Sequence, residues 1–378
     1  MEAIFIIGAT ISFSMAFLVF TKKEKSLADY ILRSWLAILG VYFIVLYSRL
    51  FIKGNVLLFE AGFSIPLLLG PVLFLYVVVI VNGENKFRSV YWLHGLPYLL
   101  FNLYFIMKFF PFGFTENWIL LNLNDESVHL FRVYFYLSSN PVYIILALFK
   151  LRRHKKNISN NFSYTENIDL IWLNYVVIFY GILWIMILVI HLLTEFPVEA
   201  YTKQGYLIYT LLTIFLFVLG FFGLKQQTIY KGEPIVGKTF KDADSTGPDR
   251  EKRYKRSGLK KAESKEYLKQ LQEYFENEKP YYNEKLNLKD VAEYLNISAN
   301  YVSQVINEQL NISFFEFVNK YRIREAKSRL CDPENENLTL MAIAFDSGFN
   351  SKSCFNRVFK KVTGFTPSQY IKREKIIQ

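Results

Sequence analysis

The stretch that decides the fold lies near the end of the chain, at Asn337–Tyr370, and reads NLTLMAIAFDSGFNSKSCFNRVFKKVTGFTPSQY. Two short helices are predicted within it. The first has apolar residues at the spacing of one helical face, including Leu340 and Ile343, and it ends at Ser347-Gly348. Glycine suits that position because a sharp turn between two helices often needs a positive φ angle.

The second helix of this stretch begins after Ser351, whose hydroxyl is placed to cap it. Its apolar face is expected to point inward and consists of Phe355, Val358 and Phe359. The opposite face is basic and carries an amide, and its residues are Lys352, Ser353, Asn356, Arg357, Lys360 and Lys361. Such a pair is typical of a helix-turn-helix unit, with Ser351–Lys361 as the recognition helix. Taken alone, it equally fits an ordinary helical hairpin with a solvated basic face.

A second copy of this pattern lies upstream, at Asn287–Val318, and reads NLKDVAEYLNISANYVSQVINEQLNISFFEFV. The cap residues Ser298 and Ser351 are 53 positions apart, whereas upstream of the turn the offset is 52. The second copy is therefore expected to have one extra residue, at Gly348. Two matching hairpins joined by one helix at Phe314–Leu330 favour a tandem helix-turn-helix unit over a chance hairpin.

The tandem arrangement resembles the DNA-binding domain of the AraC/XylS family of bacterial transcription regulators. The resemblance covers about Leu288–Arg373, and its most specific part is AIAFDSGFNSKSCFNRVFKKVTGFTPSQY, at Ala342–Tyr370. That segment is similar to a family signature of a small-residue helix, Gly-Phe, a Ser cap, Phe-x-x-x-Phe-Lys-Lys, Gly and Thr-Pro. The family implies two helix-turn-helix units, here about 288–310 and 338–362, bridged by a long helix at about 314–330.

The resemblance implies base-reading roles position by position, and helical periodicity points the same residues outward. The base-facing residues are expected to be Asn300, Ser303 and Gln304 in the first unit and Lys352, Ser353, Asn356 and Arg357 in the second. Asn and Gln side chains can pair with adenine edges, and Arg with guanine. The residues expected at phosphates are Ser298, Ser351, Lys360 and Lys361. The first recognition helix, Ala299–Leu310, has no Lys or Arg, so we expect it to give less affinity. Most basic residues of the connecting helix are expected on a solvated or salt-bridged face.

The chain is divided into an apolar part and a basic part. Lys and Arg exceed Asp and Glu by four in residues 1–224 and by seven in the shorter remainder. This asymmetry indicates a membrane domain at 1–224 and a cytoplasmic domain at 262–378 that meets an anionic partner. Between them, 225–261 is rich in charge, Gly and Ser and is expected to be a flexible linker. An amphipathic helix is predicted to begin at Ala262.

Seven apolar segments are long enough to cross a bilayer, which needs about 20 residues. They are Ala3–Phe20, Tyr30–Ile52, Gly62–Val81, Val90–Phe110, His129–Lys150, Leu170–Leu193 and Gly205–Leu224. The fifth is the weakest, because polar residues that include Arg132 and Asn140 interrupt it. The predicted fold class is all-α: a seven-span transmembrane helical bundle followed by a cytoplasmic tandem helix-turn-helix domain. That order resembles the membrane-anchored members of the AraC/XylS family.

Charge in the loops predicts how the spans are oriented. Basic residues follow the odd-numbered spans, at Lys22, Lys23 and Lys25, at Lys86 and Arg88, at Lys150–Lys156, and at Lys225. Because cytoplasmic loops carry an excess of Lys and Arg, the N-terminus is expected outside and the basic C-terminal domain in the cytoplasm. We expect a multi-pass protein of the bacterial inner membrane.

Polar side chains within the spans are expected to face the bundle interior, because burial in lipid is costly. They are His94, Asn102, Asn140, Asn174 and His191. They form either a ligand or signal pocket or ordinary hydrogen bonds between helices, and for any single residue we favour the second. Gly70-Pro71 predicts a kink in the third span. The outer loop Pro111–Val128 is interpreted as a lid or a partner contact.

The sequence thus predicts a membrane-bound, sequence-specific DNA-binding transcription regulator whose spans sense an unknown signal. The alternative is a multi-span transporter or channel with a regulatory nucleic-acid-binding domain, although the spans show no obvious inverted repeat. No catalytic, phosphate-binding or metal motif is present, and Cys331 and Cys354 are lone thiols, so neither an enzyme nor a cofactor is expected. The expected partners are double-stranded DNA, the lipid bilayer and a ligand or signalling partner, with a homodimer left open.

Overall fold

The computed structural model of the chain describes residues 2–52, 56–109, 126–165, 168–194, 203–225 and 261–377. Regular structure within these residues is helical, and the β structure there is an isolated antiparallel bridge between Phe162 and Asn287. The predicted all-α class is confirmed. The chain divides into two compact units, which are Met1–Arg152 with Leu170–Thr239 and Arg153–Asp169 with Phe240–Gln378.

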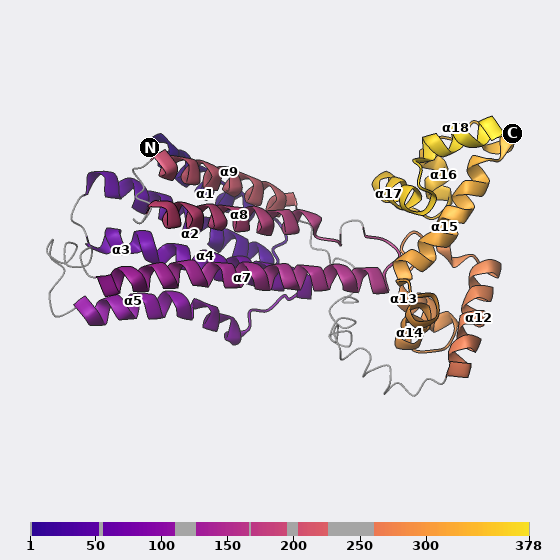
Figure 1. The fold of residues 1–378 in the computed structure, drawn as a ribbon, viewed down its shortest axis with the longest axis horizontal. Coiled ribbons are helices and arrows are strands. Elements are labelled where there is room, and N and C mark those ends of the chain that lie inside the picture. The colour runs from indigo at the N-terminus through magenta and orange to yellow at the C-terminus, as the bar shows by residue number, and fades with distance from the viewer. Residues whose placement is uncertain are drawn as a thin grey trace. The chain divides into compact units, whose positions relative to one another are not determined.

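The first unit is a bundle of long apolar helices (Figure 1). In chain order these elements are α1 (Glu2–Phe20), α2 (Leu27–Phe51), α3 (Val56–Ser64), the 3-10 helix η1 (Ile65–Leu68), α4 (Leu69–Asn82), the 3-10 helix η2 (Ser89–Gly95), α5 (Leu96–Phe109), α7 (Glu126–Asn161), α8 (Ile171–Thr194) and α9 (Lys203–Lys225). Only the part of α7 up to Arg152 belongs to this unit.

Among the described residues, six helical segments are long and apolar enough to cross a membrane. They are Glu2–Phe20, Leu27–Phe51, Glu60–Asn82, Ser89–Lys108, Ile171–Ile190 and Gly205–Lys225. These six match six of the seven predicted spans. The fifth predicted span, His129–Lys150, falls within α7, which is helical but is not among the six. The count of seven is therefore not confirmed by length and apolarity.

Helix α2 lies at the centre of the bundle and packs against α1, α4 and α9. Its inward residues recur every three or four positions, the spacing of one helical face. Among them Leu32, Trp35, Leu39 and Phe43 are fully buried. The Trp35 ring lies edge-on to Phe215 of α9, with 5.9 Å between ring centroids. The core of this unit is thus built around one face of α2.

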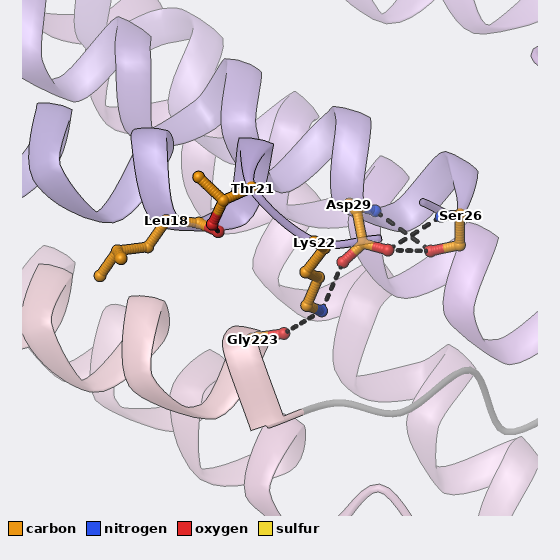
Figure 2. Close-up of polar contacts among 6 residues, drawn as sticks. All are labelled: Leu18, Thr21, Lys22, Ser26, Asp29 and Gly223. Atoms are coloured by element: carbon orange, nitrogen blue, oxygen red, sulfur yellow. Dashed lines mark hydrogen bonds and ion pairs between the residues drawn. The ribbon is translucent and has the colours of Figure 1, made fainter. Parts of the chain in front are cut away.

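A lysine joins the ends of three helices in the first unit, as Figure 2 shows. Lys22, just after α1, donates from its ammonium to the Asp29 carboxylate of α2 at 2.7 Å and to the Gly223 carbonyl oxygen of α9 at 3.1 Å. Asp29 also accepts hydrogen bonds from the backbone N–H and the hydroxyl of Ser26, the N-cap of α2. Lys22 therefore fastens the turn between α1 and α2 to the end of α9.

The helix of the third predicted span is not regular throughout. The helix is interrupted by η1, which contains Pro66 and lies one turn before Gly70-Pro71. Gly70 lets α7 come close, since a Cβ atom there would lie 2.5 Å from Oδ1 of Asn140. Pro71 has no N–H to donate to the Leu67 carbonyl four residues earlier, so the interruption lies in the turn that the predicted proline kink affects.

The second unit consists of short helices together with the last part of α7, residues 153–161. In chain order its other elements are α12 (Lys261–Asn277), the 3-10 helix η4 (Pro280–Tyr282), α13 (Leu288–Tyr294), α14 (Ala299–Leu310), α15 (Phe314–Leu330), the 3-10 helix η5 (Pro333–Asn335), α16 (Leu340–Asp346), α17 (Lys352–Thr363) and α18 (Pro367–Ile377). The helix predicted to begin at Ala262 is α12.

Two small hydrophobic cores lie along α15 in this unit. Phe314 and Phe317, near its start, belong to the core formed with α12, α13 and α14. Ile323 and Ala326, further along, belong to the core formed with α16 and α17. Helix α15 therefore bridges two helix-turn-helix units, as the sequence predicts. The greater part of the expected linker, 226–260, and of the expected outer loop, 110–125, lies outside the described residues.

Candidate nucleic-acid interface

The first helix-turn-helix unit is bounded by three local signals. Asn287 caps α13 and forms a reciprocal capping box with Asp290. The turn contains Asn296 at φ 51°, in the left-handed region where Asn is tolerated better than most residues. Ser298 then caps α14 by accepting from the Tyr301 backbone N–H. These short polar residues fix both the angle and the start of the recognition helix.

The second unit repeats the same geometry. Gly348 has φ 88° and occupies the position of Asn296, and Ser351 caps α17. After the turn, the Phe349 N–H donates to Ala344 just as the Ile297 N–H donates to Ala292, so the offset of 52 still holds at this point. The extra residue of the second copy is consequently Asn350. The sequence-based placement at Gly348 was wrong, because the left-handed residue exists in both copies.

Gly348 has a second role that the sequence did not reveal. A Cβ atom at this position would lie 2.1 Å from the backbone oxygen of Tyr281, in η4. No side chain fits at that distance, so the turn of the second unit packs directly on the backbone that precedes the first unit. The absence of a side chain at Gly348 thus allows the second unit to pack against the backbone of η4 within one compact unit.

The outer face of α17 matches the prediction. Its predicted inward residues, Phe355, Val358 and Phe359, are buried. All of its predicted outward residues are exposed, namely Lys352, Ser353, Asn356, Arg357, Lys360 and Lys361. Helix α17 therefore presents one continuous basic face that also carries an amide and a hydroxyl. Such a face can supply both base-edge and phosphate contacts in a major groove.

On α14, only one of the three predicted base-facing residues is exposed. Asn300 is exposed, but Ser303 is only 9% exposed and Gln304 only 3%. The expectation that Ser303 and Gln304 face outward is therefore wrong in this structure. Ser303 lies on the same stripe as Ile306 and the other core residues of α14, and the Gln304 amide donates to the Glu308 carboxylate one turn away.

The two serines predicted at phosphates act as helix caps. The Ser298 hydroxyl accepts from the Tyr301 N–H at 3.2 Å, and the Ser351 hydroxyl accepts from the Cys354 N–H at 3.3 Å. Ser298 is exposed, whereas Ser351 is 8% exposed. A capping hydroxyl still lies beside the helix N-terminus, where anions bind, but burial leaves Ser351 little surface to offer.

Two basic residues of α17 have partners inside the protein. The Lys361 ammonium lies 2.7 Å from the carboxylate of Glu316, in the first turn of α15. This contact, with the hydrogen bonds from Ser313, holds the pKa of Glu316 below its ordinary value. The Arg357 guanidinium donates to the Thr165 hydroxyl at 3.1 Å. Thr165 belongs to the segment that follows α7, far from α17 in the sequence.

Basic residues of α15 form the salt-bridged face that the sequence predicts. Arg324 lies 2.6 Å from Glu276 of α12, and Arg329 lies 2.8 Å from Glu325. The exposed pair of Arg324 and Glu276 contributes about 0–1 kcal/mol. Both arginines are thus engaged in ion pairs within the protein.

Arg322 differs from the other basic residues of α15, because its side chain is 1% exposed. Its guanidinium donates to the backbone oxygens of Tyr281 and Asn283 at 2.8 and 2.7 Å. It also donates to the backbone oxygen and the hydroxyl of Ser163 at 2.9 and 3.0 Å. Burial lowers the pKa of Arg322 to about 10, so the group stays charged at neutral pH. The sequence did not single out this buried charge.

In the first unit, Asn140 has the interior position predicted for it. Its side chain is fully buried, and its amide donates to the Pro66 carbonyl at 3.3 Å. The Tyr180 hydroxyl of α8 donates to Oδ1 of Asn140 at 3.0 Å. Asn140 thus joins three helical segments by hydrogen bonds.

Two other polar residues predicted within the spans have hydrogen-bond partners of their own. His94 lies 3.4 Å from the Tyr143 hydroxyl, and the Asn102 amide donates back to its own helix. Asn174 is half-buried in α8, and His191 lies near the end of that helix. Among the described residues, no cluster of three or more His, Cys, Asp or Glu is arranged to hold a metal ion.

Comparison with known proteins identifies the second unit. A family model described as a helix-turn-helix domain matches residues 291–373. An uncharacterized HTH-type transcriptional regulator of Staphylococcus aureus (strain COL) is 36% identical over 90 residues, which are 24% of this chain and 12% of the relative. The melibiose operon regulatory protein of Escherichia coli (strain K12) is 30% identical over 91 residues, 24% of this chain and 29% of the relative. No solved structure matches the chain.

The class defined by these matches and by the fold is that of helix-turn-helix DNA-binding domains. More narrowly, the C-terminal domain is of the AraC type, which confirms the resemblance seen in the sequence. The matched segment covers less than a third of either relative and about a quarter of this chain. The remaining three quarters, including the whole apolar bundle, lie outside these matches.

Proposed function

We propose that the chain is a membrane-bound transcription regulator that binds specific promoter sequences through its two recognition helices. The observation that carries the proposal is the outer face of α17, which presents an arginine, an asparagine and three lysines on a domain of the AraC type. Arg357 and Asn356 are the proposed base readers, and Lys360 and Lys361 are the proposed phosphate contacts.

The two recognition helices contribute unequally in this proposal. Helix α17 supplies most of the electrostatic attraction to DNA, whereas α14 has no Lys or Arg and presents Asn300. Because α15 and Gly348 hold the units in one domain, both helices can enter successive major grooves on one face of the duplex, about one helical turn apart. Binding by α14 then adds specificity more than affinity.

Membrane anchoring is supported by the surface of the first unit. Its outward side chains are large and apolar, and include Phe17, Phe149 and Ile185, each at least 62% exposed. A water-soluble surface rarely carries so many such residues together, whereas a lipid-facing surface requires them. We place the six apolar helices in a bilayer, with the helix-turn-helix domain in the cytoplasm, where DNA is.

A contact at one end of the bundle supports α7 as a seventh span. Lys22 and Gly223 are in contact, so both lie on the same side of the membrane, and an even number of crossings must separate them. Five of the six apolar segments lie between these residues. Helix α7 supplies the sixth crossing, and its 36 residues extend about 54 Å, more than the roughly 30 Å of a hydrocarbon core.

Seven crossings also agree with the charge of the loops. The basic residues Lys150–Lys156, in the last part of α7, then lie in the cytoplasm with those that follow α1 and α4. The N-terminus is outside in this arrangement, and the spans are placed to receive a signal from the membrane or beyond it. We propose the bacterial inner membrane as the location.

Genome-wide mapping of DNA bound by the full chain in living cells tests this function. We expect a limited number of enriched sites that share a motif with two half-sites about 10–11 base pairs apart. The control is the Asn356→Ala/Arg357→Ala variant, which should remain in the membrane fraction and lose those sites. Absence of enrichment for the unaltered chain, at normal abundance in the membrane, would contradict the proposal.

A further inference from the structure

The segment between α7 and α8 belongs to the same compact unit as the helix-turn-helix domain. Ile158 and Phe162, from the end of α7 and just beyond it, are 2% and 6% exposed. Phe162 forms an antiparallel bridge with Asn287, the residue that caps α13. A connection between two proposed spans is therefore built into the DNA-binding unit.

Ser163 is the centre of this contact and is fully buried. Its N–H and its hydroxyl both donate to the Leu286 carbonyl, at 3.1 and 2.6 Å. Its backbone oxygen accepts from Arg322 and from the Asn319 amide, at 2.9 and 3.1 Å, and its hydroxyl also accepts from Arg322. Two of the four oxygens that hold the buried guanidinium thus come from one residue of the α7–α8 connection.

This arrangement makes the buried charge of Arg322 depend on the segment. A buried guanidinium that loses hydrogen-bond acceptors is strongly unfavourable, because its N–H groups would be neither solvated nor paired. A fragment that begins after residue 225 lacks Ser163 altogether. Loss of Ser163 from the contact would therefore leave part of the buried guanidinium without acceptors.

The same segment reaches the outer face of the recognition helix two residues later. Thr165 accepts a hydrogen bond from Arg357, the proposed guanine reader of α17. Tyr164, between Ser163 and Thr165, is half-buried, and burial together with the negative charge of Asp290 raises its pKa. Residues 162–165 therefore run from the capping residue of the first unit to the base-reading face of the second.

We propose that residues 162–165 are a docking segment through which the α7–α8 connection inhibits DNA binding. In the docked state Thr165 occupies space on the outer face of α17 and takes one of the N–H groups that Arg357 needs for bidentate pairing with guanine. Release of the segment frees Arg357. The inference rests on the proposed function, and it names the element by which the membrane helices control the DNA reader.

Docking must weaken DNA binding by the same factor by which DNA binding weakens docking, because coupling between two binding events is reciprocal. Movement of α7 or α8 is carried to residues 162–165 by the chain itself, since these residues follow α7 directly. A signal that displaces either helix therefore changes the docked population and, through it, the affinity for DNA.

A reversible crosslink tests the opposition directly. Phe162 and Asn287 face each other across an antiparallel bridge, where Cα atoms lie about 4.5–5.5 Å apart, within the range of a disulfide. The Phe162→Cys/Asn287→Cys variant is made in the full chain with the exposed Cys331 replaced by Ser, and is placed in lipid nanodiscs. We expect the oxidised form to bind DNA about fivefold or more weakly than the same protein after reduction. The reduced protein is its own control for damage caused by the substitutions.

A milder variant tests the contact with Arg357. Thr165→Val removes the hydroxyl and nearly keeps the side-chain shape, so the full chain should bind its DNA sites roughly two- to tenfold more tightly. The matched control is the same substitution in an Arg357→Ala background, where Thr165→Val should have no effect. A gain of equal size in that background would overturn the role of Arg357.

Failure of the docking segment and failure of the proposed function, on which it rests, give different outcomes. If the full chain prefers particular sequences but neither the crosslink nor Thr165→Val changes its affinity, the docking segment is refuted and the proposed function stands. If the full chain binds all DNA equally, the proposed function fails. The crosslink comparison on that DNA still decides whether docking and DNA compete.

Discussion

Two glycines of the second helix-turn-helix unit have similar backbone angles but different surroundings. Gly348 and Gly364 have φ 88° and 81°, yet a Cβ atom at Gly348 would meet the Tyr281 carbonyl at 2.1 Å, whereas nothing lies within 4 Å of one at Gly364. Gly364→Ala should cost only the strain of a left-handed alanine, about 1–2 kcal/mol. Gly348→Ala should cost roughly 2 kcal/mol more, because the backbone must move.

Hydrogen exchange of the α16 and α17 amides in the solubilised full chain measures this difference. We expect clearly faster exchange in Gly348→Ala than in Gly364→Ala. Equal exchange in the two variants would show that the turn does not rest on the Tyr281 backbone.

Arg357 and Lys360 should affect DNA binding in different ways, although both are exposed on α17. Arg357→Ala is expected to cost about 1–3 kcal/mol at one base pair and to relax the sequence preference there. Lys360→Ala should weaken binding to all sequences and reduce the salt dependence by about one phosphate contact. Titrations of a set of single-base variants at several salt concentrations separate these effects. If Arg357→Ala weakened binding to all sequences and Lys360→Ala relaxed the preference at one base pair, the base-reading and phosphate roles of the two residues would be exchanged.

At the residue scale, the sequence predicted α17 well and α14 poorly. The basic face of α17 is opposite a strong aromatic stripe, so helical periodicity alone places Arg357 correctly. Ser303 is small enough for the core, and its polarity misled the prediction. Arg322 and Ser163 were missed for a different reason: their contact joins residues 159 positions apart, which local patterns do not encode.

Between elements, the contact of α17 with α15 should depend on pH. The pKa of Glu316 is lowered, first by its hydrogen bond with Lys361, so the stabilisation is present above the ordinary pKa of 4.5 and is lost as pH falls through the lowered value. Lys361→Met should therefore speed hydrogen exchange in the first turn of α15 at pH 7 and have no effect at sufficiently acid pH. Lys360→Met removes the same charge from the neighbouring position and should leave that turn unchanged at both pH values.

At the element scale, caps and apolar spacing were sufficient to predict α12 to α17 of the second unit, whereas α18 was not predicted. Ser298, Ser313 and Ser351 each begin a helix where the sequence places one. The one-residue insertion was misplaced because Gly348 is conspicuous in the sequence, whereas Asn296 adopts the same left-handed conformation without glycine. Helix α7 was harder to predict, because polar residues interrupt its apolar pattern although the helix is continuous in the structure.

At the scale of the whole chain, the two units have different chemistry and a shared connection. The first exposes apolar side chains over its helices, and the second exposes a basic face on α17. The sequence predicted this division from composition alone. It did not predict that Arg153–Asp169, between two helices of the first unit, belongs to the second. Composition marks that segment only as a basic loop, and its role depends on tertiary contacts of Ser163 and Thr165.

The proposed function requires that this chain distinguish one DNA sequence from another. The most direct measurement is the affinity of the full chain in lipid nanodiscs for a labelled DNA fragment recovered by genome-wide mapping, compared with a shuffled fragment of the same length and composition, at about 0.15 M salt. We predict binding to the recovered fragment at least about a thousandfold tighter than to the shuffled one. Equal affinity for the two fragments would show that the chain does not bind DNA by sequence.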